Sequence, residues 1–599
     1  MRQMLMPIGA LGTMLWAGLA ALLAAPAAPL AAPAARDQGA CEQIKSACQR
    51  AGFARGAART GSGLLRDCIG PIMQGAPPPA RASKPLPPID PQLVSACKTS
   101  DPSFGQGRVP PAEPAAQPAP APAAVATAVP NTPPPAAASD GKRPNIVFIL
   151  TDDLAWNLVQ YMPHVLKMQQ EGVSFSNYFV TDSLCCPSRS SIFTGRFPHD
   201  TGIFRNTGSD GGFMAFHNRH HEQSTFATAL QAVGYRTAML GKYLNGYEPV
   251  KDSPEPGWSM WAVAGNGYPE FNYGLNEDGK LAHYGGEPTD YLTDVLSGKA
   301  VNFIKQSAGA PFMIEIATFA PHMPYTPAPR DANAFSGLQA PQGPAFNAAP
   351  DQNAPQWLRR HPALTPNDIA SIDGDFRRRA QSVLAVDQMI GELQAAVAAI
   401  GEEKNTYFVF SSDNGYHMGE YRLMPGKMTA FDTDIRVPLV VTGPGIAAGR
   451  RVEEIAENID LNPTFNQIGG ATTPANVDGL SLVPVLHGEP VAAWRRVALV
   501  EHHGPVRNMV DPDFPGVRSG NPTTYEAIRG PSWLYVEYAN GEKEYHDLAA
   551  DPDELHNTYS SLSIDDKASL HATIAAVQNC HDAQSCAAAD RSDRNAARR

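Results

Sequence analysis

The chain has 599 residues, of which 43% are hydrophobic and 18% are charged, and its formal net charge is −12 at pH 7. This composition indicates a globular protein that is long enough for one large domain with smaller attachments. The acidic balance argues against a general nucleic-acid-binding protein. An anionic substrate would have to be attracted by a few local cations rather than by the overall charge.

The N-terminus has the pattern of a secretory signal peptide. Residues 1–35 contain one early Arg, a long apolar stretch and an Ala/Pro tail with A-x-A sites, which predicts cleavage between residues 25 and 35. An uncleaved membrane anchor is the alternative. Because no later stretch is long and apolar enough to span a bilayer, we expect a secreted or periplasmic protein without stable membrane insertion after signal cleavage.

Export makes disulfide bonds possible, and six cysteines are placed to form them. Four lie near the N-terminus and two close a short loop near the C-terminus: Cys41, Cys48, Cys68, Cys97, Cys580 and Cys586. These six can pair as three bridges, of which Cys580–Cys586 is the safest prediction. Residues 36–101 are predicted to be a small cysteine-bearing module, and the Pro/Ala-rich residues 102–142 a semi-rigid linker.

From residue 143 the sequence has the pattern of a folded α/β domain. Short, almost continuously apolar runs alternate with helix-like stretches, which predicts a mostly parallel sheet buried on both faces by helices. The predicted strands are 145–150, 236–240, 312–319, 406–410 and 437–441. We predict a catalytic domain over residues 143–496. Residues 497–599 should form a smaller C-terminal subdomain, with a small antiparallel sheet and a helix, and a tail.

Charged and amide side chains follow four of these strands. In chain order they are Asp152, Asp153, Lys242, His322, Asp413 and Asn414. Each one alone is more typical of a helix cap or a solvated side chain, but ligands bind beyond the carboxyl ends of the strands in such sheets, so the coincidence predicts one site. The carboxylates and the amide offer only oxygen ligands, which suit Ca²⁺, with Mg²⁺ as the alternative, better than zinc.

Three cations would lie beside this metal: Arg189, Lys242 and Lys427. A metal ion surrounded by fixed cations binds a tetrahedral oxyanion, which indicates transfer of a sulfuryl or phosphoryl group. An obvious nucleophile is missing, and Cys185 lies in the segment that could supply one.

The segment CCPSRSSIFTG, which begins at Cys185, matches the type I sulfatase signature C-x-P-S-R-x-x-x-x-T-G. Segments such as PNIVFILTDD, GKYLN, APHMPY and SSDNGYHMGE occur in the order expected for that family, and the resemblance covers about residues 143–560. The chain most resembles the N-acetylglucosamine-6-sulfatase and extracellular heparan 6-O-endosulfatase branch. The resemblance implies an alkaline-phosphatase-like α/β/α sandwich with a mostly parallel central sheet and a smaller C-terminal subdomain.

The resemblance gives Cys185 its role. In sulfatases the first cysteine of this signature is oxidised to formylglycine (3-oxoalanine), which implies a formylglycine-generating maturation enzyme as a partner. The aldehyde hydrates to a geminal diol, one hydroxyl attacks sulfur, and the alcohol leaves. The covalent sulfo-enzyme then expels sulfate as the aldehyde reforms.

The remaining site residues carry over by position. Ca²⁺ would be bound by Asp152, Asp153, Asp413, Asn414 and an oxygen of the modified Cys185. Arg189 would stabilise the hydrated aldehyde, and Lys242 and Lys427 would hold the sulfate oxygens. His322 is the candidate general acid for the departing oxygen, a role it could share with Lys427.

One motif departs from the family. Many sulfatases have GKWH, whose histidine helps to deprotonate the diol, whereas this chain has Leu244 followed by Asn245 at that place. His417, three residues after Asn414, is our hypothetical substitute, and a substrate-contacting or merely buried histidine is the alternative. Asn245 is predicted to contact substrate. Cys186 is interpreted as a small buried spacer, and the basic run FRRRA (376–380) as a solvated helix face that could also contact a polyanionic glycan.

These features predict a sulfatase that hydrolyses the sulfate ester of a sulfated sugar, such as a glucosamine 6-sulfate, or of an aryl sulfate. A phosphonate monoester or phosphodiester hydrolase of the same superfamily is the first alternative. A non-catalytic domain that binds sulfated glycans is the second.

Overall fold

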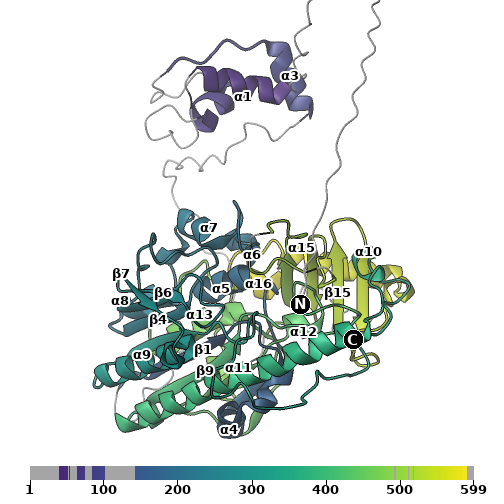
Figure 1. Cartoon of the computed structure of the whole chain (residues 1–599). Coiled ribbons are helices and arrows are strands. Elements are labelled where there is room, and N and C mark those ends of the chain that lie inside the picture. The colour runs from purple at the N-terminus through teal and green to yellow at the C-terminus, as the bar shows by residue number, and fades with distance from the viewer. Residues whose placement is uncertain are drawn as a thin grey trace, which may run out of the picture. The chain divides into compact units, whose positions relative to one another are not determined.

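The computed structural model describes residues 40–51, 53, 64–74, 84–100, 142–491, 494–509, 511–516 and 518–589 (Figure 1). The chain divides into two compact units, Met1–Val129 and Pro130–Arg599. The predicted signal peptide lies outside the described residues, and so does the predicted linker apart from Lys142. Among the described helices, none has the length and apolar character needed to cross a membrane.

The first unit is a small helical module held by two disulfides. Its helices are α1 (Ala40–Arg50), the π-helix η2 (Leu64–Ile69), α2 (Gly70–Gln74) and α3 (Pro91–Ser100). Cys41 bonds to Cys97 and Cys48 to Cys68. The cysteines are part of the module's core, together with apolar side chains such as Ile44 and Phe53. So small a core gains its stability in large part from such cross-links.

The second unit is built on a mixed ten-stranded sheet with the order β11-β2-β10-β9-β1-β8-β4-β5-β6-β7. The central strands β9, β1, β8, β4 and β5 run parallel. The strands are β1 (Asn145–Thr151), β2 (Val173–Phe175), β4 (Arg236–Lys242), β5 (Met260–Ala264), β6 (Tyr273–Glu277), β7 (Lys280–Tyr284), β8 (Phe312–Ala317), β9 (Thr406–Ser412), β10 (Leu439–Thr442) and β11 (Arg450–Val452). The predicted fold class is confirmed.

Strand β1 shows why this sheet forms, because all seven of its residues are buried. Ile146 and Phe148 join one hydrophobic core with helices α5 (Cys185–Thr194), α8 (Phe226–Ala232) and α13 (Leu461–Gly469). Val147 and Ile149 join a second core with α4 (Pro163–Glu171), α9 (Leu292–Gln306) and α11 (Pro366–Ala399). Side chains alternate across a strand, so an uninterrupted apolar run requires helices on both faces (Figure 1).

The run 437–441 forms β10, which lies antiparallel to β9 rather than parallel. The chain leaves β9 at the carboxyl ends of the parallel strands, beside Asp413, and His417 and Lys427 in the connection lie at the same end of the sheet. A chain that re-enters the sheet at the end where it left must run in the opposite direction.

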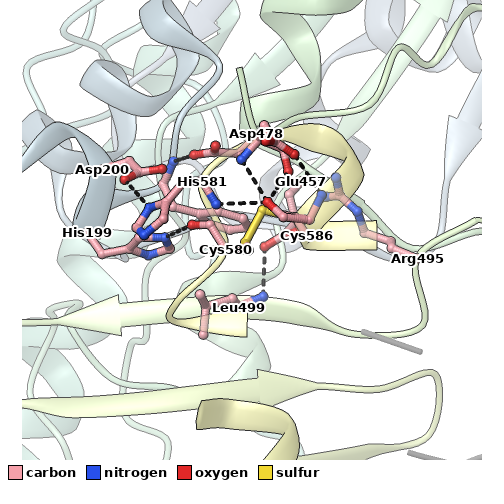
Figure 2. The surroundings of a disulfide bond; sticks show 12 residues. His199, Asp200, Glu457, Asp478, Arg495, Leu499, Cys580, His581 and Cys586 are labelled. Atoms are coloured by element: carbon pink, nitrogen blue, oxygen red, sulfur yellow. Dashed lines mark hydrogen bonds and ion pairs between the residues drawn. A yellow bond between two sulfur atoms is a disulfide. The ribbon is translucent and has the colours of Figure 1, made fainter. Parts of the chain in front are cut away.

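The C-terminal region forms a four-stranded antiparallel sheet, as predicted. Its strands are β13 (Ala498–His502), β14 (Tyr525–Arg529), β15 (Trp533–Tyr538) and β16 (Lys543–Asp547). Helix α15 (Ile564–Val577) packs on it through Leu570 and Ile574. The predicted Cys580–Cys586 bridge is present and joins the chain just before α16 (Ala583–Ala589) to a residue of that helix, beside His199 and Asp200 (Figure 2).

The remaining elements are short and connect these layers. They are η3 (Trp156–Tyr161), β3 (Tyr178–Phe179), α6 (Pro198–Thr201), α7 (Gly212–Asn218), η4 (His221–Gln223), η5 (Pro288–Asp290), α10 (Gln356–Arg359), η6 (Glu403–Asn405), α12 (Asp432–Ile435), β12 (Ala456–Glu457), η7 (Asn458–Asp460), α14 (Val483–Leu486) and η8 (Tyr559–Ser561).

Candidate active site

The carboxylates predicted from the strand ends meet at one edge of the sheet. The backbone N–H of Asp153 donates to Asp413 Oδ1 over 3.2 Å, and Asn414 Nδ2 donates to Asp153 Oδ1 over 2.7 Å. Lys242, the last residue of β4, forms an ion pair with Asp152. All of these side chains are buried. Strands β1, β4 and β9 therefore bring them together as the parallel topology requires.

Cys185 is the first residue of α5 and points into this cluster. Its Sγ lies 3.2 Å from Asp152 Oδ1 and 2.9 Å from Lys427 Nζ. Burial raises the pKa of the Cys185 thiol well above its usual range, and the charges of Asp152 and Asp413 raise it further. An unmodified thiol here would thus be a poor nucleophile. Cys186 is also buried, and it forms no disulfide with Cys185, which agrees with its interpretation as a spacer.

The three predicted cations lie around Cys185. Arg189 Nε donates to Asp413 Oδ2 over 2.8 Å, and its Nη1 donates to the Lys242 carbonyl over 3.0 Å. Lys427 Nζ lies 2.6 Å from Asp153 Oδ1. Burial alone would lower the pKa values of Lys242 and Lys427, but the facing aspartates raise both well above the ordinary value, so both are ammonium ions.

His322 follows β8 and enters the same cluster. Its Nδ1 lies 2.7 Å from the Met323 carbonyl, and its Nε2 lies 2.7 Å from Asp513 Oδ1 and 3.6 Å from Asp153 Oδ2. Burial opposes protonation, but the carboxylates of Asp153, Asp152 and Asp513 raise the pKa of His322. A carbonyl and a carboxylate as neighbours suit an imidazolium that donates from both nitrogens.

The donor set fits a hard divalent cation. The ligand atoms of Asp152, Asp153, Cys185 and His322 lie within 4.8 Å of one another. Asn414 Oδ1 is buried and accepts no hydrogen bond within the described residues, so it is available to a cation. Asp152, Asp153, Asp413 and Asn414 offer the carboxylate and amide oxygens that Ca²⁺ prefers.

A cleft of about 600 Å³ opens onto this cluster. Asp153, His322 and Lys427 line its inner end, and Asp375, Arg378 and Arg518 line it as well. A cleft of this size accommodates a small ligand such as one or two sugar rings. The reacting group would enter at the end where Cys185 contacts Lys427.

Comparisons with known proteins identify the family. The family profile described as Sulfatase matches residues 144–471, and that described as N-sulphoglucosamine sulphohydrolase, C-terminal, matches residues 419–579. Human N-acetylglucosamine-6-sulfatase is 34% identical over 475 residues, which are 74% of this chain and 86% of that protein. The chain belongs to the sulfatase family. It is accordingly a sulfuric ester hydrolase.

Two solved structures place the fold in the same superfamily. A structure described as a complex with its substrate D-glucosamine-2-N,6-O-disulfate has a TM-score of 0.63 and 25% identity, and covers 76% of this chain and 100% of its own. The phosphonate monoester hydrolase of Agrobacterium radiobacter has a TM-score of 0.54 at 22% identity and covers 71% of this chain and 93% of its own. The second likeness shows the fold alone.

The candidate site also contains Asp513, which sequence reasoning missed. Asp513 Oδ1 lies 2.7 Å from both His322 Nε2 and Lys427 Nζ, and its Oδ2 accepts from Asn206 Nδ2 over 2.6 Å. Burial would raise the pKa of Asp513, but the charges of Lys427 and His322 hold it well below the usual range. The residue lies between β13 and β14, in a Pro-rich stretch without a motif, so only the tertiary fold reveals it.

The two predicted substrate contacts have different surroundings. Asn245 Nδ2 donates to Asp513 Oδ2 over 3.2 Å, and its Oδ1 is buried without a partner in the described part of the chain. His417 is fully buried, with Nδ1 3.0 Å from the Asp434 carboxylate and Nε2 3.0 Å from the Ser519 carbonyl. Asn245 thus belongs to the central cluster, whereas the contacts of the His417 ring join the β9–β10 connection to the C-terminal region.

The FRRRA run on α11 is not a uniform solvated face. Arg377 donates to the Leu338 carbonyl, and the exposed Arg378 pairs with Asp375. Arg379 is buried, donates to the carbonyls of Asp153 and Pro321, and its guanidinium lies over the Tyr416 ring at 4.2 Å. The solvated-face interpretation is wrong for Arg379, because successive residues point about 100° apart around a helix and three in a row cannot all face solvent.

Proposed function

We propose that this sulfatase hydrolyses the sulfate ester of a sulfated sugar, with N-acetylglucosamine 6-sulfate as the first substrate to test. The observation that carries the proposal is the position of Cys185 Sγ between Asp152 Oδ1 and Lys427 Nζ, since Lys427 also lines the cleft. The 34% identity to human N-acetylglucosamine-6-sulfatase and the likeness to the glucosamine disulfate complex support the sugar.

The proposed mechanism requires conversion of Cys185 to formylglycine by a maturation enzyme. The hydrated aldehyde supplies one hydroxyl to attack sulfur and a second hydroxyl whose deprotonation lets sulfate leave. Burial keeps a residual Cys185 thiol protonated, which argues against thiolate attack. Its position at the start of α5 directs the side chain at the carboxylate cluster.

Each neighbouring side chain then has a task that its contacts support. Lys427 and Lys242 are fixed ammonium ions that would hold the sulfate oxygens and stabilise charge in the transition state. Arg189, anchored on Asp413, would hold the hydrated aldehyde. His322 would give the proton on Nε2 to the departing sugar oxygen, with Asp513 holding the ring in place until then.

The group that these residues would hold is Ca²⁺. Asp152, Asp153, Asp413 and Asn414 would be its protein ligands, with an oxygen from residue 185, and Mg²⁺ is the alternative ion. The cation would screen the repulsion between the aspartates and polarise the sulfate group.

We also propose export of the mature enzyme to the periplasm or the extracellular space. The disulfides Cys41–Cys97, Cys48–Cys68 and Cys580–Cys586 support this, because such bonds persist in oxidising compartments.

Substrate comparison tests the proposal. Purified enzyme, co-expressed with a formylglycine-generating enzyme, would be assayed on N-acetylglucosamine 6-sulfate, an aryl sulfate and an aryl phosphodiester. We expect the highest kcat/KM on the sugar sulfate. A higher kcat/KM on the phosphodiester would instead support a phosphonate or phosphodiester hydrolase, whose fold the chain shares.

A further inference from the structure

A second cluster of metal-ligating side chains lies at α7, outside the active site. It combines His217 in the last turn of α7, Glu222 in η4 and Glu255 in the connection between β4 and β5. One ligand atom from each of the three lies within 4.8 Å of the others. His220, two residues before Glu222, lies beside them, with its Nδ1 3.7 Å from Glu222 Oε1.

The two carboxylates of this cluster are buried, and among the described residues they form no ion pair with a buried Lys or Arg. The side chains of Glu222 and Glu255 are each only 5% exposed. Each keeps one oxygen, Oε2, that is buried and has no hydrogen-bond partner in the part of the chain that the structure describes. Buried carboxylates in this situation require a proton or a cation.

The imidazoles supply the other half of a ligand set. His217 Nδ1 lies 3.3 Å from Glu255 Oε1. The side chains of His217 and His220 are 48% and 71% exposed, so their rings can reorient by small χ rotations. Two imidazole nitrogens with two carboxylate oxygens suit a transition cation, and zinc takes such ligands in tetrahedral geometry. The oxygen-rich site at Asp152 and Asp153 suits a different ion.

We propose that His217, His220, Glu222 and Glu255 form a structural zinc site. The ligand atoms must draw together from their present spacing, because zinc holds N and O ligands at about 2.0–2.2 Å. The site would tie α7 to the connection that carries Glu255. Helix α7 packs on α5, and the Phe213 N–H donates to the Asn245 carbonyl over 2.8 Å. Zinc would thereby stabilise a wall of the active site without touching substrate.

Zinc titration of the full-length protein tests this site directly. The protein would be dialysed against EDTA, saturated with Ca²⁺ to fill the oxygen-rich site, and titrated with Zn²⁺ in a calorimeter. We expect the wild type to bind one zinc ion that His217→Ala/His220→Ala binds at least about 10-fold more weakly. The control is His221→Ala, since His221 Nε2 contacts the Thr201 carbonyl at 2.7 Å instead. Equal zinc binding by wild type and the double variant would overturn the proposal.

A second variant keeps the test independent of folding. Glu255→Gln removes a buried charge while keeping the shape of the side chain, so in EDTA its Tm should equal or exceed that of the wild type. Added Zn²⁺ should raise the Tm of the wild type and leave that of Glu255→Gln unchanged. A Tm that zinc raises equally in both proteins, or in neither, would contradict the site.

Discussion

Two buried carboxylate clusters in this protein are neutralised in different ways. At the candidate active site, Asp152, Asp153 and Asp413 each face a fixed Lys or Arg. At α7, the ion-pair partners of Glu222 and Glu255 in the described part of the chain are the exposed His220 and His217. A buried acid requires a partner in either case. The cations of the first cluster are buried and fixed, whereas the imidazoles of the second cluster are exposed and can reorient.

The largest effect on activity is expected from Cys185, which lies among the aspartates and lysines of the first cluster. Cys185→Ala should lower kcat/KM on the sulfate ester by at least about 10⁴-fold, because the variant cannot form the nucleophile. Cys186→Ala is the matched control, and its kcat/KM should stay within about twofold, since the Cys186 side chain is buried in the hydrophobic core. Steady-state kinetics on both variants checks this, and a similar loss in both would contradict the division of roles between the two cysteines.

His417 has a carboxylate partner of its own and allows a sharper test. The base hypothesis requires His417→Ala to lower kcat about 100-fold and to accumulate sulfo-enzyme. The contacts of both ring nitrogens with acceptors favour a structural role instead, so we expect turnover near the wild-type rate. Rapid quench followed by intact-protein mass spectrometry measures that species. Turnover at the wild-type rate without accumulation of sulfo-enzyme would show that His417 is not the base. Its role would then be structural, through its contacts with Asp434 and Ser519.

Arg379 is a further cation beside the cluster of Asp152, Asp153 and Asp413. Its guanidinium donates to backbone carbonyls. It donates to the carbonyl of Asp153, which holds a left-handed φ of 64°. Arg379→Met should free this loop and lower kcat/KM up to about 100-fold by misplacing ligands. It should also raise the Ca²⁺ concentration needed for half-maximal thermal stabilisation. Arg377→Met, from the same helix, is the control, and equal effects of both changes would refute a positioning role for Arg379.

The smallest effect concerns a histidine whose carboxylate partner is buried. His199 Nδ1 lies 2.8 Å from Glu501 Oε2 (Figure 2 shows His199 beside Cys580). Burial alone would lower the pKa of His199, but Glu501 raises this pKa to about 9. The stabilisation is therefore complete below the unfolded pKa of about 6.5 and is lost as pH rises through about 9.

Chemical denaturation at pH 7 and pH 10 measures this stabilisation. The free energy of unfolding of the wild type should fall by roughly 1–2 kcal/mol more than that of His199→Gln, after allowance for solvent screening. Parallel pH dependences in the two proteins would show that the His199–Glu501 pair contributes nothing measurable.

Much of the active site could be predicted because its residues lie next to strands or inside a motif. Asp152 and Asp413 follow apolar runs, and the parallel topology carries them to one edge without further information. Asp513 could not be predicted, because the C-terminal region that delivers it is placed by packing between distant segments. Arg379 was hidden by its neighbours, since three adjacent arginines do not indicate which of them is buried. Strand β10 was predicted, but its antiparallel direction depends on where the preceding connection runs.

The central claim is that residue 185 acts as an aldehyde and not as a thiol. Mass spectrometry of the tryptic peptide 168–189, taken from active enzyme, tests it most directly. We predict the mass of formylglycine or its hydrate at position 185, an aldehyde that reacts with a hydrazide probe, and activity in proportion to the converted fraction. An intact cysteine throughout a fully active preparation would contradict the account.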